Sequence, residues 1–460
     1  MNFKSLFALT PAVALAAPVV GSQPDSKPNI VIIYTDDLGL GDVSFANGKV
    51  VETPNIDKQA AKGKIFSQYY SACPVSSPSR VALTTGMYHI RWNINTFLNN
   101  KKFNSNCEQS DFLDSSAPTL AKNLKTVGYK TAHIGKWHMG GGRDVKNAPQ
   151  ITSYGFDSYV STWESPDPDP VITSSNWIWS ATDSVRRWNR TAYFVDKCID
   201  FLKNNSEKPC FLNLWPDDPH TPWVYDEATE QDRNSHESQK NLVGVIVELD
   251  KQLGRLFDYI EASGKAENTI IVFTSDNGPS PSFDQIRTNQ KRGVKNSLYE
   301  GGINMPFFIS WPAQIKAGQT DSKSVIASID LMPTLTNIAG ATNVTHHDID
   351  GENISKAFLT NKVYSRKKDL RWEYGRNATF NYPQKVNRSL QLAIRHKNFK
   401  LYCNADGSVT ELYDLKSDPN ETTDISAKNK KLTDKLTKQL VKWYSDNDKE
   451  MLHKKQTSSL

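Results

Sequence analysis

The chain has 460 residues, of which 38% are hydrophobic, 23% charged and 10% aromatic, so it can build a packed interior and is neither a small stapled scaffold nor an intrinsically disordered protein. Its 55 Lys and Arg residues against 50 Asp and Glu residues leave a formal net charge of +5. That charge is too mild and too scattered for a nucleic-acid-binding protein, and it suits an anionic substrate only weakly.

The first residues have the layout of a secretory signal. Lys4 precedes an apolar run from Leu6 that ends in the small residues Ala14, Ala16 and Ala17. We therefore expect residues 1–20 to be a cleavable signal peptide and the protein to be periplasmic or secreted. No later segment reaches the roughly 18 uninterrupted apolar residues that a membrane-spanning helix needs.

Buried strands alternate with helical patterns through most of the chain. The run NIVIIY at 29–34 consists mainly of apolar, β-branched residues, as in a strand that is covered on both faces, and similar runs follow at 129–134, 210–214 and 269–274. Between them lie helical patterns that begin at Thr53-Pro54 or extend over 117–127 and 241–262. This order predicts an α/β fold with a mostly parallel central sheet, whose ligands bind beyond the carboxyl ends of the strands.

The character of the sequence changes near residue 366. Short segments of period two at 390–395, 399–402 and 410–415 are followed by a polar helical pattern at 430–445. We expect a catalytic domain at 28–365 and a C-terminal subdomain at 366–460, made of a small antiparallel sheet and a helix. The five cysteines leave at least one thiol unpaired, and Cys198 with Cys210 is one possible disulfide.

Two acidic pairs follow predicted strands directly. Asp36 and Asp37 come after the first strand, and Asp276 and Asn277 come after the strand at 269–274. Adjacent carboxylates repel each other unless a cation lies between them, and such oxygen ligands suit calcium or magnesium. Either pair alone could equally be a solvated turn, but together they favour one divalent metal site.

Basic side chains and histidines mark further strand ends. Lys136 and His138 follow one predicted strand, and His220 follows the next; at such positions they can bind an oxyanion and move a proton. A single histidine of this kind is more often structural, whereas two on neighbouring strands favour a function. The segment Pro78-Ser79-Arg80 is typical of a helix start, whose N-terminus would face residue 76 and favour an anion.

A family resemblance connects these features. The segment SSPSR at 76–80, continued by TG at 85–86, resembles the signature of type I sulfatases, in which the first residue of a Cys/Ser-x-Pro-Ser-Arg motif is converted to formylglycine. The resemblance extends over roughly residues 28–425 through the motifs NIVIIYTDDLG, TPNID, GYKTAHIGKWH, TSDNG, KNSLYEGG and ELYDLKSDPNE. It implies the fold of the alkaline phosphatase superfamily, which agrees with the α/β pattern.

The resemblance also implies roles for particular residues. Formylglycine would form from Ser76, and calcium would be held by that residue together with Asp36, Asp37, Asp276 and Asn277. Arg80 and Lys136 would stabilise the aldehyde hydrate, while His220 and Lys295 would meet the sulfate and its bridging oxygen. We expect His220 to protonate the leaving oxygen as general acid and His138 to remove the proton of the hydrate.

Serine at position 76 implies conversion by the bacterial radical maturation system, unless the serine replaces a cysteine and leaves the protein inactive. Arg143 and Asp144, which follow three glycines, could grip sugar hydroxyl groups or could equally form a surface turn. We expect a calcium-dependent sulfatase that removes sulfate from a sulfated glycan, exo-acting and of galactose or N-acetylhexosamine type. The alternatives are a phosphate or phosphonate ester hydrolase of the same superfamily and an unmatured glycan-binding protein.

Overall fold

The computed structural model describes residues 27–173, 180, 182–344 and 347–458. The predicted signal peptide at 1–20 lies outside these residues. Within the described residues, none of the helices combines the length and the apolar character needed to span a bilayer.

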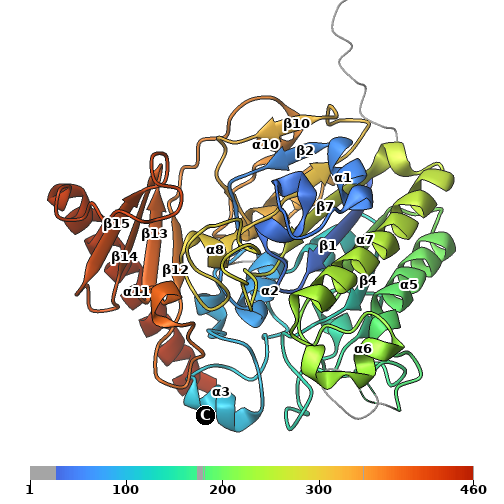
Figure 1. Ribbon diagram of the computed structural model, residues 1–460, viewed down its shortest axis with the longest axis horizontal. Helices are drawn as coiled ribbons and strands as arrows, with labels where there is room; N and C mark the ends of the chain where they lie inside the picture. Colours follow the sequence, from blue (N-terminus) through green and yellow to red (C-terminus); the bar gives the residue numbers. More distant parts are fainter. Residues whose placement is uncertain (1–26, 174–179, 181, 345–346, 459–460) are drawn as a thin grey trace, which may run out of the picture.

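A central sheet of eight strands organises the larger part of the molecule (Figure 1). Five neighbouring strands pair in parallel. Four of them were predicted, namely β7 (Thr269–Ser275), β1 (Asn29–Thr35), β6 (Cys210–Trp215) and β4 (Lys130–Gly135), whereas the edge strand β5 (Ser158–Ser161) was not. Next to β7 the sheet continues through β9 (Phe308–Ser310), β2 (Lys64–Phe66) and β10 (Gln319–Asp321), and its β7–β9 and β9–β2 pairings are antiparallel. These three short strands were not predicted.

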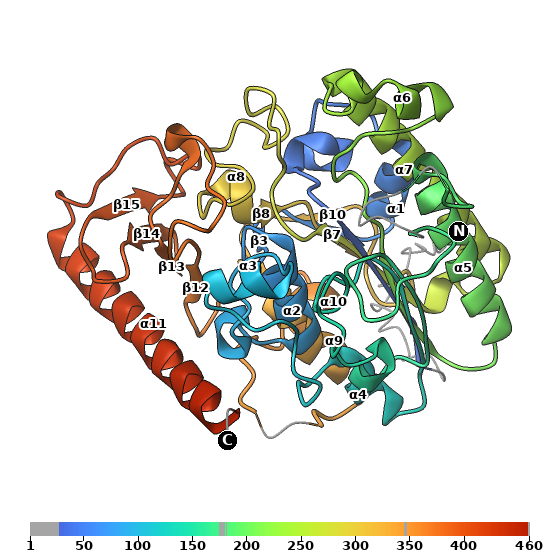
Figure 2. The same cartoon turned by 90° about the horizontal axis from the view of Figure 1, so that it is seen from below.

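Helices cover both faces of the sheet because β1 is apolar on both sides. Ile30 and Ile32 pack in one core cluster, whereas Val31 and Ile33 pack in the other. Figure 2 shows the two helical layers, one on each side of the sheet. The first layer holds α2 (Ser76–Thr85), α4 (Leu120–Lys125), α9 (Leu331–Ile338) and α10 (Ser355–Leu359). The second layer holds α1 (Pro54–Ala61), α5 (Arg190–Asn204) and α7 (Gln239–Ala262).

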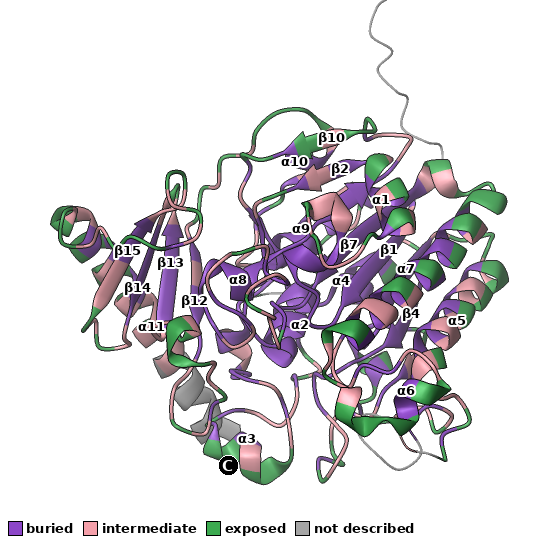
Figure 3. Ribbon diagram, in the orientation of Figure 1, coloured by how far each residue is buried: buried purple, intermediate pink, exposed green. Residues whose placement is uncertain are grey.

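Burial follows this layering, with buried strands in the centre and exposed residues on the outer faces of the helices (Figure 3). The helix predicted at 117–127 is shorter, because the hydroxyl of Thr119 accepts a hydrogen bond from the backbone N–H of Lys122 and α4 begins only at Leu120. The remaining short elements are α3 (Lys101–Asn106), α6 (Glu227–Gln231), α8 (Glu300–Ile303), β3 (Tyr69–Tyr70), β8 (Asn304–Met305) and β11 (Ile326–Ala327).

The C-terminal part is the predicted antiparallel sheet with one helix. Its strands run in the order β12 (Leu370–Glu373), β13 (Leu392–His396), β14 (Phe399–Cys403) and β15 (Thr410–Asp414). The helix α11 (Lys430–Ser458) is longer than predicted and packs on one face of this sheet through Leu436 and Leu440. The other face packs against the larger part through Trp372 and Tyr402. A domain boundary at residue 365 stays a prediction.

All five cysteines are buried free thiols. The possible disulfide between Cys198 and Cys210 is therefore not formed in the structure. Both thiols lie in the apolar core beneath the second helical layer, where cysteine packs as a small hydrophobic residue.

Candidate active site

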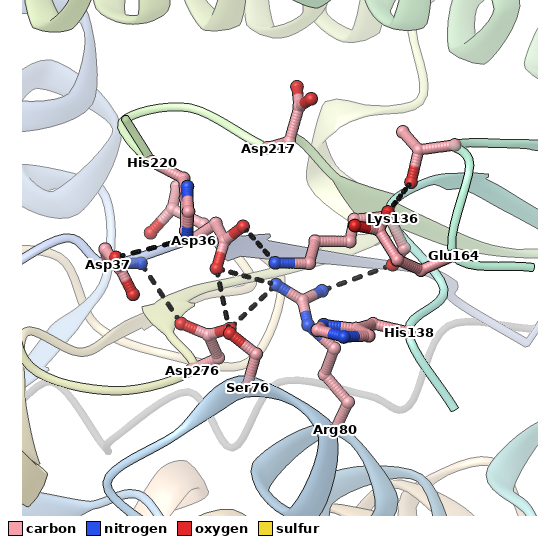
Figure 4. A network of polar contacts seen from close by, with 12 residues as sticks. Asp36, Asp37, Ser76, Arg80, Lys136, His138, Glu164, Asp217, His220 and Asp276 are labelled. Carbon is pink, nitrogen blue, oxygen red and sulfur yellow. Dashed lines mark hydrogen bonds and ion pairs between the residues drawn. The ribbon is translucent and has the colours of Figure 1, made fainter. Parts of the chain in front are cut away.

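The two predicted acidic pairs meet at one end of the central sheet. β1 and β7 are parallel neighbours, with Thr35 opposite Ser275, so the residues that follow them lie side by side. Asp36, Asp37 and Asp276 are all buried, and each offers a carboxylate oxygen within 4.8 Å of the others (Figure 4). The backbone N–H of Asp37 donates to Asp276 Oδ1 at 3.1 Å, and Asn277 Nδ2 donates to Asp37 Oδ1 at 2.7 Å.

Ser76 begins helix α2 directly beside these carboxylates. Its Oγ donates a hydrogen bond to Asp36 Oδ1 at 3.1 Å and lies 3.3 Å from Asn277 Oδ1. The side chain is only 2% exposed. Residue 76 therefore lies at a helix N-terminus, where the helix dipole favours negative charge, and within reach of the acidic cluster.

Three cations surround the acidic cluster. Arg80 Nη2 lies 2.8 Å from Asp276 Oδ2, Lys136 Nζ donates to Asp36 Oδ2 at 2.6 Å, and Lys295 Nζ donates to Asp37 Oδ2 at 2.8 Å. Arg80 also lies over the rings of Tyr34 and Trp215. Each carboxylate thus has a basic partner, although the three partners come from distant parts of the chain.

The donor set fits a divalent cation. Burial, and next the repulsion from Asp36, raise the pKa of Asp276 to about 7, so this carboxyl is only partly ionised near neutrality unless further positive charge is present. Asp36 behaves differently: burial opposes its ionisation, but Lys136, His220 and Arg80 hold its pKa well below the usual value. A hard cation bound by these oxygens would relieve the remaining repulsion.

Both predicted histidines face the same region with defined tautomers. Since a carbonyl oxygen only accepts hydrogen bonds, His138 donates from Nε2 to the Leu98 carbonyl at 3.0 Å, and its Nδ1 has no hydrogen-bond partner within the described part of the chain. His220 likewise donates from Nδ1 to the Thr221 carbonyl at 2.7 Å, and its Nε2 accepts from Lys295 Nζ at 3.1 Å. Burial lowers the pKa of both rings, with Lys136 adding to the effect at His138 and Lys295 at His220.

A cavity of about 330 Å³ opens onto these groups. The predicted residues that line it are Ser76, Lys136, His138, Arg143, His220 and Lys295. Asp144 does not line it: its exposed carboxylate accepts a hydrogen bond from the Lys101 backbone N–H at 2.9 Å. A substrate-binding role of Asp144 stays a prediction.

Sequence reasoning missed several lining residues, namely Phe97, Asn99, Glu164, Asn296 and Asn381. They lie on four separate loops, and only Asn296 had a local signal, because it neighbours Lys295. It also missed Arg287, which is fully buried and donates to the Asp37 carbonyl and to Asp42 Oδ2, both at 2.8 Å. Arg287 thereby fixes the loop that carries Asp37.

Comparison with known proteins gives two family models for this chain. The model described as Sulfatase matches residues 28–341, and the model described as N-sulphoglucosamine sulphohydrolase, C-terminal, matches residues 293–446. The chain is 26% identical to N-acetylgalactosamine-6-O-sulfatase of Bacteroides thetaiotaomicron, over 95% of this chain and 98% of that protein. It is 29% identical to human N-acetylgalactosamine-6-sulfatase, over 75% of this chain and 68% of that protein.

Among solved structures, the chain is similar to Ps i-CgsB in complex with k-i-k-neocarrahexaose. The TM-score is 0.74 and the sequence identity 26%, and the match covers 92% of this chain and 94% of that one. The similarity therefore extends over both the large sheet and the C-terminal part.

Proposed function

The chain belongs to the sulfatase family and has its α/β fold, and we propose that it removes sulfate from a sulfated carbohydrate, of galactose or N-acetylhexosamine type, at the end of a glycan. One observation carries the proposal: a serine at a helix N-terminus, two lysines and two histidines line one cavity, and three carboxylates and Arg80 lie directly beside them. The names of the two N-acetylgalactosamine-6-sulfatases support a sulfated hexosamine as the substrate class.

We infer that Asp36, Asp37, Asp276 and Asn277 hold calcium together with residue 76, and that Ser76 is the precursor of formylglycine. When present, the cation and the formylglycine supply an activated hydroxyl nucleophile. We further propose that a bacterial radical maturase makes the conversion and that residues 1–20 direct the protein to the periplasm or the exterior.

The basic side chains offset the charge of the substrate. A sulfate monoester carries one negative charge, which moves toward the leaving oxygen as the S–O bond breaks. Lys136, Lys295 and Arg80 are already held close to the position of the ester by their carboxylate partners, so they need no rearrangement. The N-terminus of α2 adds backbone N–H groups to the same region.

The two histidines transfer protons at different groups, His138 at residue 76 and His220 at the leaving oxygen. His138 offers its free Nδ1 to remove a proton from the group at residue 76, while the bond from Nε2 to Leu98 keeps the ring oriented. His220 gives a proton to the leaving sugar oxygen. Its ring is neutral in the free protein, and the bound anionic ester favours its protonated form.

Two measurements test the proposal. Mass spectrometry of the peptide that contains Ser76 should show a loss of about 2 Da after expression with the maturase, since that loss marks the aldehyde. The matured protein should then release sulfate from sulfated galactose or N-acetylhexosamine and be far slower on matched phosphate and phosphonate esters. Preferred hydrolysis of the phosphorus esters, or an unmodified Ser76 in a protein that only binds glycans, would contradict it.

A further inference from the structure

A small recess adjoins the catalytic cavity between Lys136 and His220. Its volume is about 20 Å³, and Lys136, Glu164 and His220 line both spaces. A space of roughly 10–15 Å³ already holds one water molecule, so the recess has room for one oxygen atom such as that of a hydroxyl group. Thr162, Arg187 and Asp217 belong to the recess but not to the larger cavity.

Several buried polar atoms in the walls of the recess lack a hydrogen-bond partner within the described part of the chain. Arg187 is 2% exposed, and among the described residues its Nε and Nη1 make no hydrogen bond; the same holds for Asp217 Oδ1. Arg187 Nη1 and Asp217 Oδ1 lie 3.5 Å apart. Glu164 is 4% exposed, and the contact at its carboxylate is a long one of 3.5 Å from Thr162 Oγ1. Unsatisfied buried groups are costly, which points to a missing polar ligand.

These groups are held rigidly in place. Arg187 Nη2 lies 2.7 Å from Asp218 Oδ1 and donates to the His220 carbonyl at 3.3 Å. Arg190 pairs with the other oxygen of Asp217. The recess is therefore preorganised, and a ligand that enters it loses little free energy to rearrangement of the walls.

The chemistry of the recess selects a neutral hydroxyl group. Two carboxylates, those of Glu164 and Asp217, repel a sulfate, whereas a hydroxyl can donate to one of them and accept from Arg187. In the proposed function His220 faces the leaving oxygen, so the space beside His220 lies on the side of the sugar. A hydroxyl of the ring that bears the ester would reach this recess first.

We propose that Glu164, Arg187 and Asp217 form a subsite that binds one free hydroxyl group of the sugar carrying the sulfate ester. This subsite rests on the proposed function and deepens it, because it makes a specific hydroxyl of the leaving group a determinant of specificity. A sugar without that hydroxyl would leave Arg187 Nε and Nη1 and Asp217 Oδ1 without a hydrogen-bond partner, and it would bind poorly in the transition state.

The test compares kcat/KM for a sugar sulfate and its monodeoxy analogues on matched variants. The matured enzyme is first assayed on the 6-sulfates of galactose, N-acetylgalactosamine and N-acetylglucosamine, with 4-nitrophenyl sulfate as a substrate that has no sugar. For the best sugar, removal of one hydroxyl should lower kcat/KM at least about tenfold in the wild type. In Arg187→Met and Glu164→Gln, kcat/KM for the intact sugar sulfate should fall at least about tenfold. In these variants the analogue that lacks the hydroxyl should then have nearly the same kcat/KM as the intact sugar sulfate.

Arg190→Met is the control, because Arg190 supports Asp217 without lining the recess. It should lower the activity on all sugar substrates alike and keep the penalty for the missing hydroxyl. If Arg187→Met fails to fold, Arg187→Lys and Glu164→Gln carry the test. The subsite proposal is wrong if removal of the hydroxyl lowers kcat/KM equally in the wild type and in the variants, or if it has no effect in the wild type. Either result leaves the sulfatase proposal intact. Hydrolysis of 4-nitrophenyl sulfate alone overturns the sugar substrate and the subsite with it.

Discussion

The guanidinium of Arg80 lies 2.8 Å from Asp276 Oδ2, and both side chains are fully buried. Arg80 follows Ser76 by four residues on helix α2, so the two side chains lie on the same face of that helix. The ion pair therefore ties the helix that begins with the proposed formylglycine precursor to Asp276 at the end of β7, 196 positions after Arg80.

Replacement of Arg80 by Met should abolish sulfatase activity and lower the free energy of unfolding by about 3–5 kcal/mol in metal-free buffer, because it leaves buried carboxylates without their cation. Urea unfolding and sulfate release measure the two effects. Arg80→Lys should recover part of the stability. A variant of wild-type stability would show that the pair does not support the acidic cluster.

Calcium should raise the melting temperature of the protein, since it would bind the folded state alone. At a free calcium concentration 100 times the Kd, the stabilisation is about 2.7 kcal/mol. Asp37→Asn and Asp276→Asn should lose this shift in differential scanning fluorimetry. Asp226→Asn, which alters a helix cap of α6 outside the site, should keep it. An equal shift in all variants would place the cation elsewhere.

His220→Ala should slow the hydrolysis of a sugar sulfate by about 10²–10⁴ in kcat, because a sugar alkoxide leaves only when it is protonated. The same variant should lose far less on 4-nitrophenyl sulfate, whose leaving group needs no proton. The ratio of the two losses is the diagnostic quantity. Equal losses on both substrates would mean that His220 binds the sulfate instead of protonating the leaving oxygen.

Buried His89 should make the fold sensitive to acid. Burial lowers its pKa from 6.5 to about 3, and its Nδ1 donates to the Ile94 carbonyl. Its contribution to stability is complete above pH 6.5 and is lost as the pH falls toward 3, because only the unfolded chain takes up the proton; the slope is about 1.4 kcal/mol per pH unit. In urea titrations from pH 7 to pH 4, His89→Gln should reduce the slope. An unchanged slope would assign acid sensitivity to other groups.

Lys400 should be essential for the attachment of the C-terminal sheet. Its buried Nζ lies 2.8 Å from Glu300 Oε1 and 3.5 Å from Glu421 Oε1. Lys400→Met should lower the free energy of unfolding by about 3–5 kcal/mol, since two buried carboxylates then face each other. Adding Glu300→Gln and Glu421→Gln should restore much of the loss in the same urea experiment. No recovery would indicate that packing of the lysine stem, not charge, matters.

Much of the fold was predictable because its central strands are unusual segments. Residues 30–34, for example, are apolar at every position, which occurs where both faces of a strand are covered. The short strands β2, β9 and β10 have only three residues each, too few for any period to emerge. Strand order was not predictable from pattern alone, although it decides that Asp36 and Asp276 meet.

The candidate site likewise contains residues that could be predicted from the sequence and residues that could not. The chemistry-bearing residues that follow buried strands or belong to sequence motifs were predicted and lie together. Glu164 and Arg187 were missed because neither directly follows a predicted strand nor belongs to a recognised motif. Arg143 and Asp144 are adjacent in the sequence and were predicted together as sugar-binding residues, yet only Arg143 lines the cavity.

The burial of Ser76 limits when, relative to folding, a modifying enzyme can reach this residue. At 2% exposure, its hydroxyl is out of reach of any modifying enzyme once the protein has folded. Trp372 in β12 holds the segment just before Ser76, because its Nε1 donates to the Ser71 carbonyl at 2.8 Å. The burial of this segment therefore depends on a strand 301 positions after Ser71. The conversion that we propose at residue 76 would therefore have to precede the docking of β12, and premature folding would leave Ser76 unconverted.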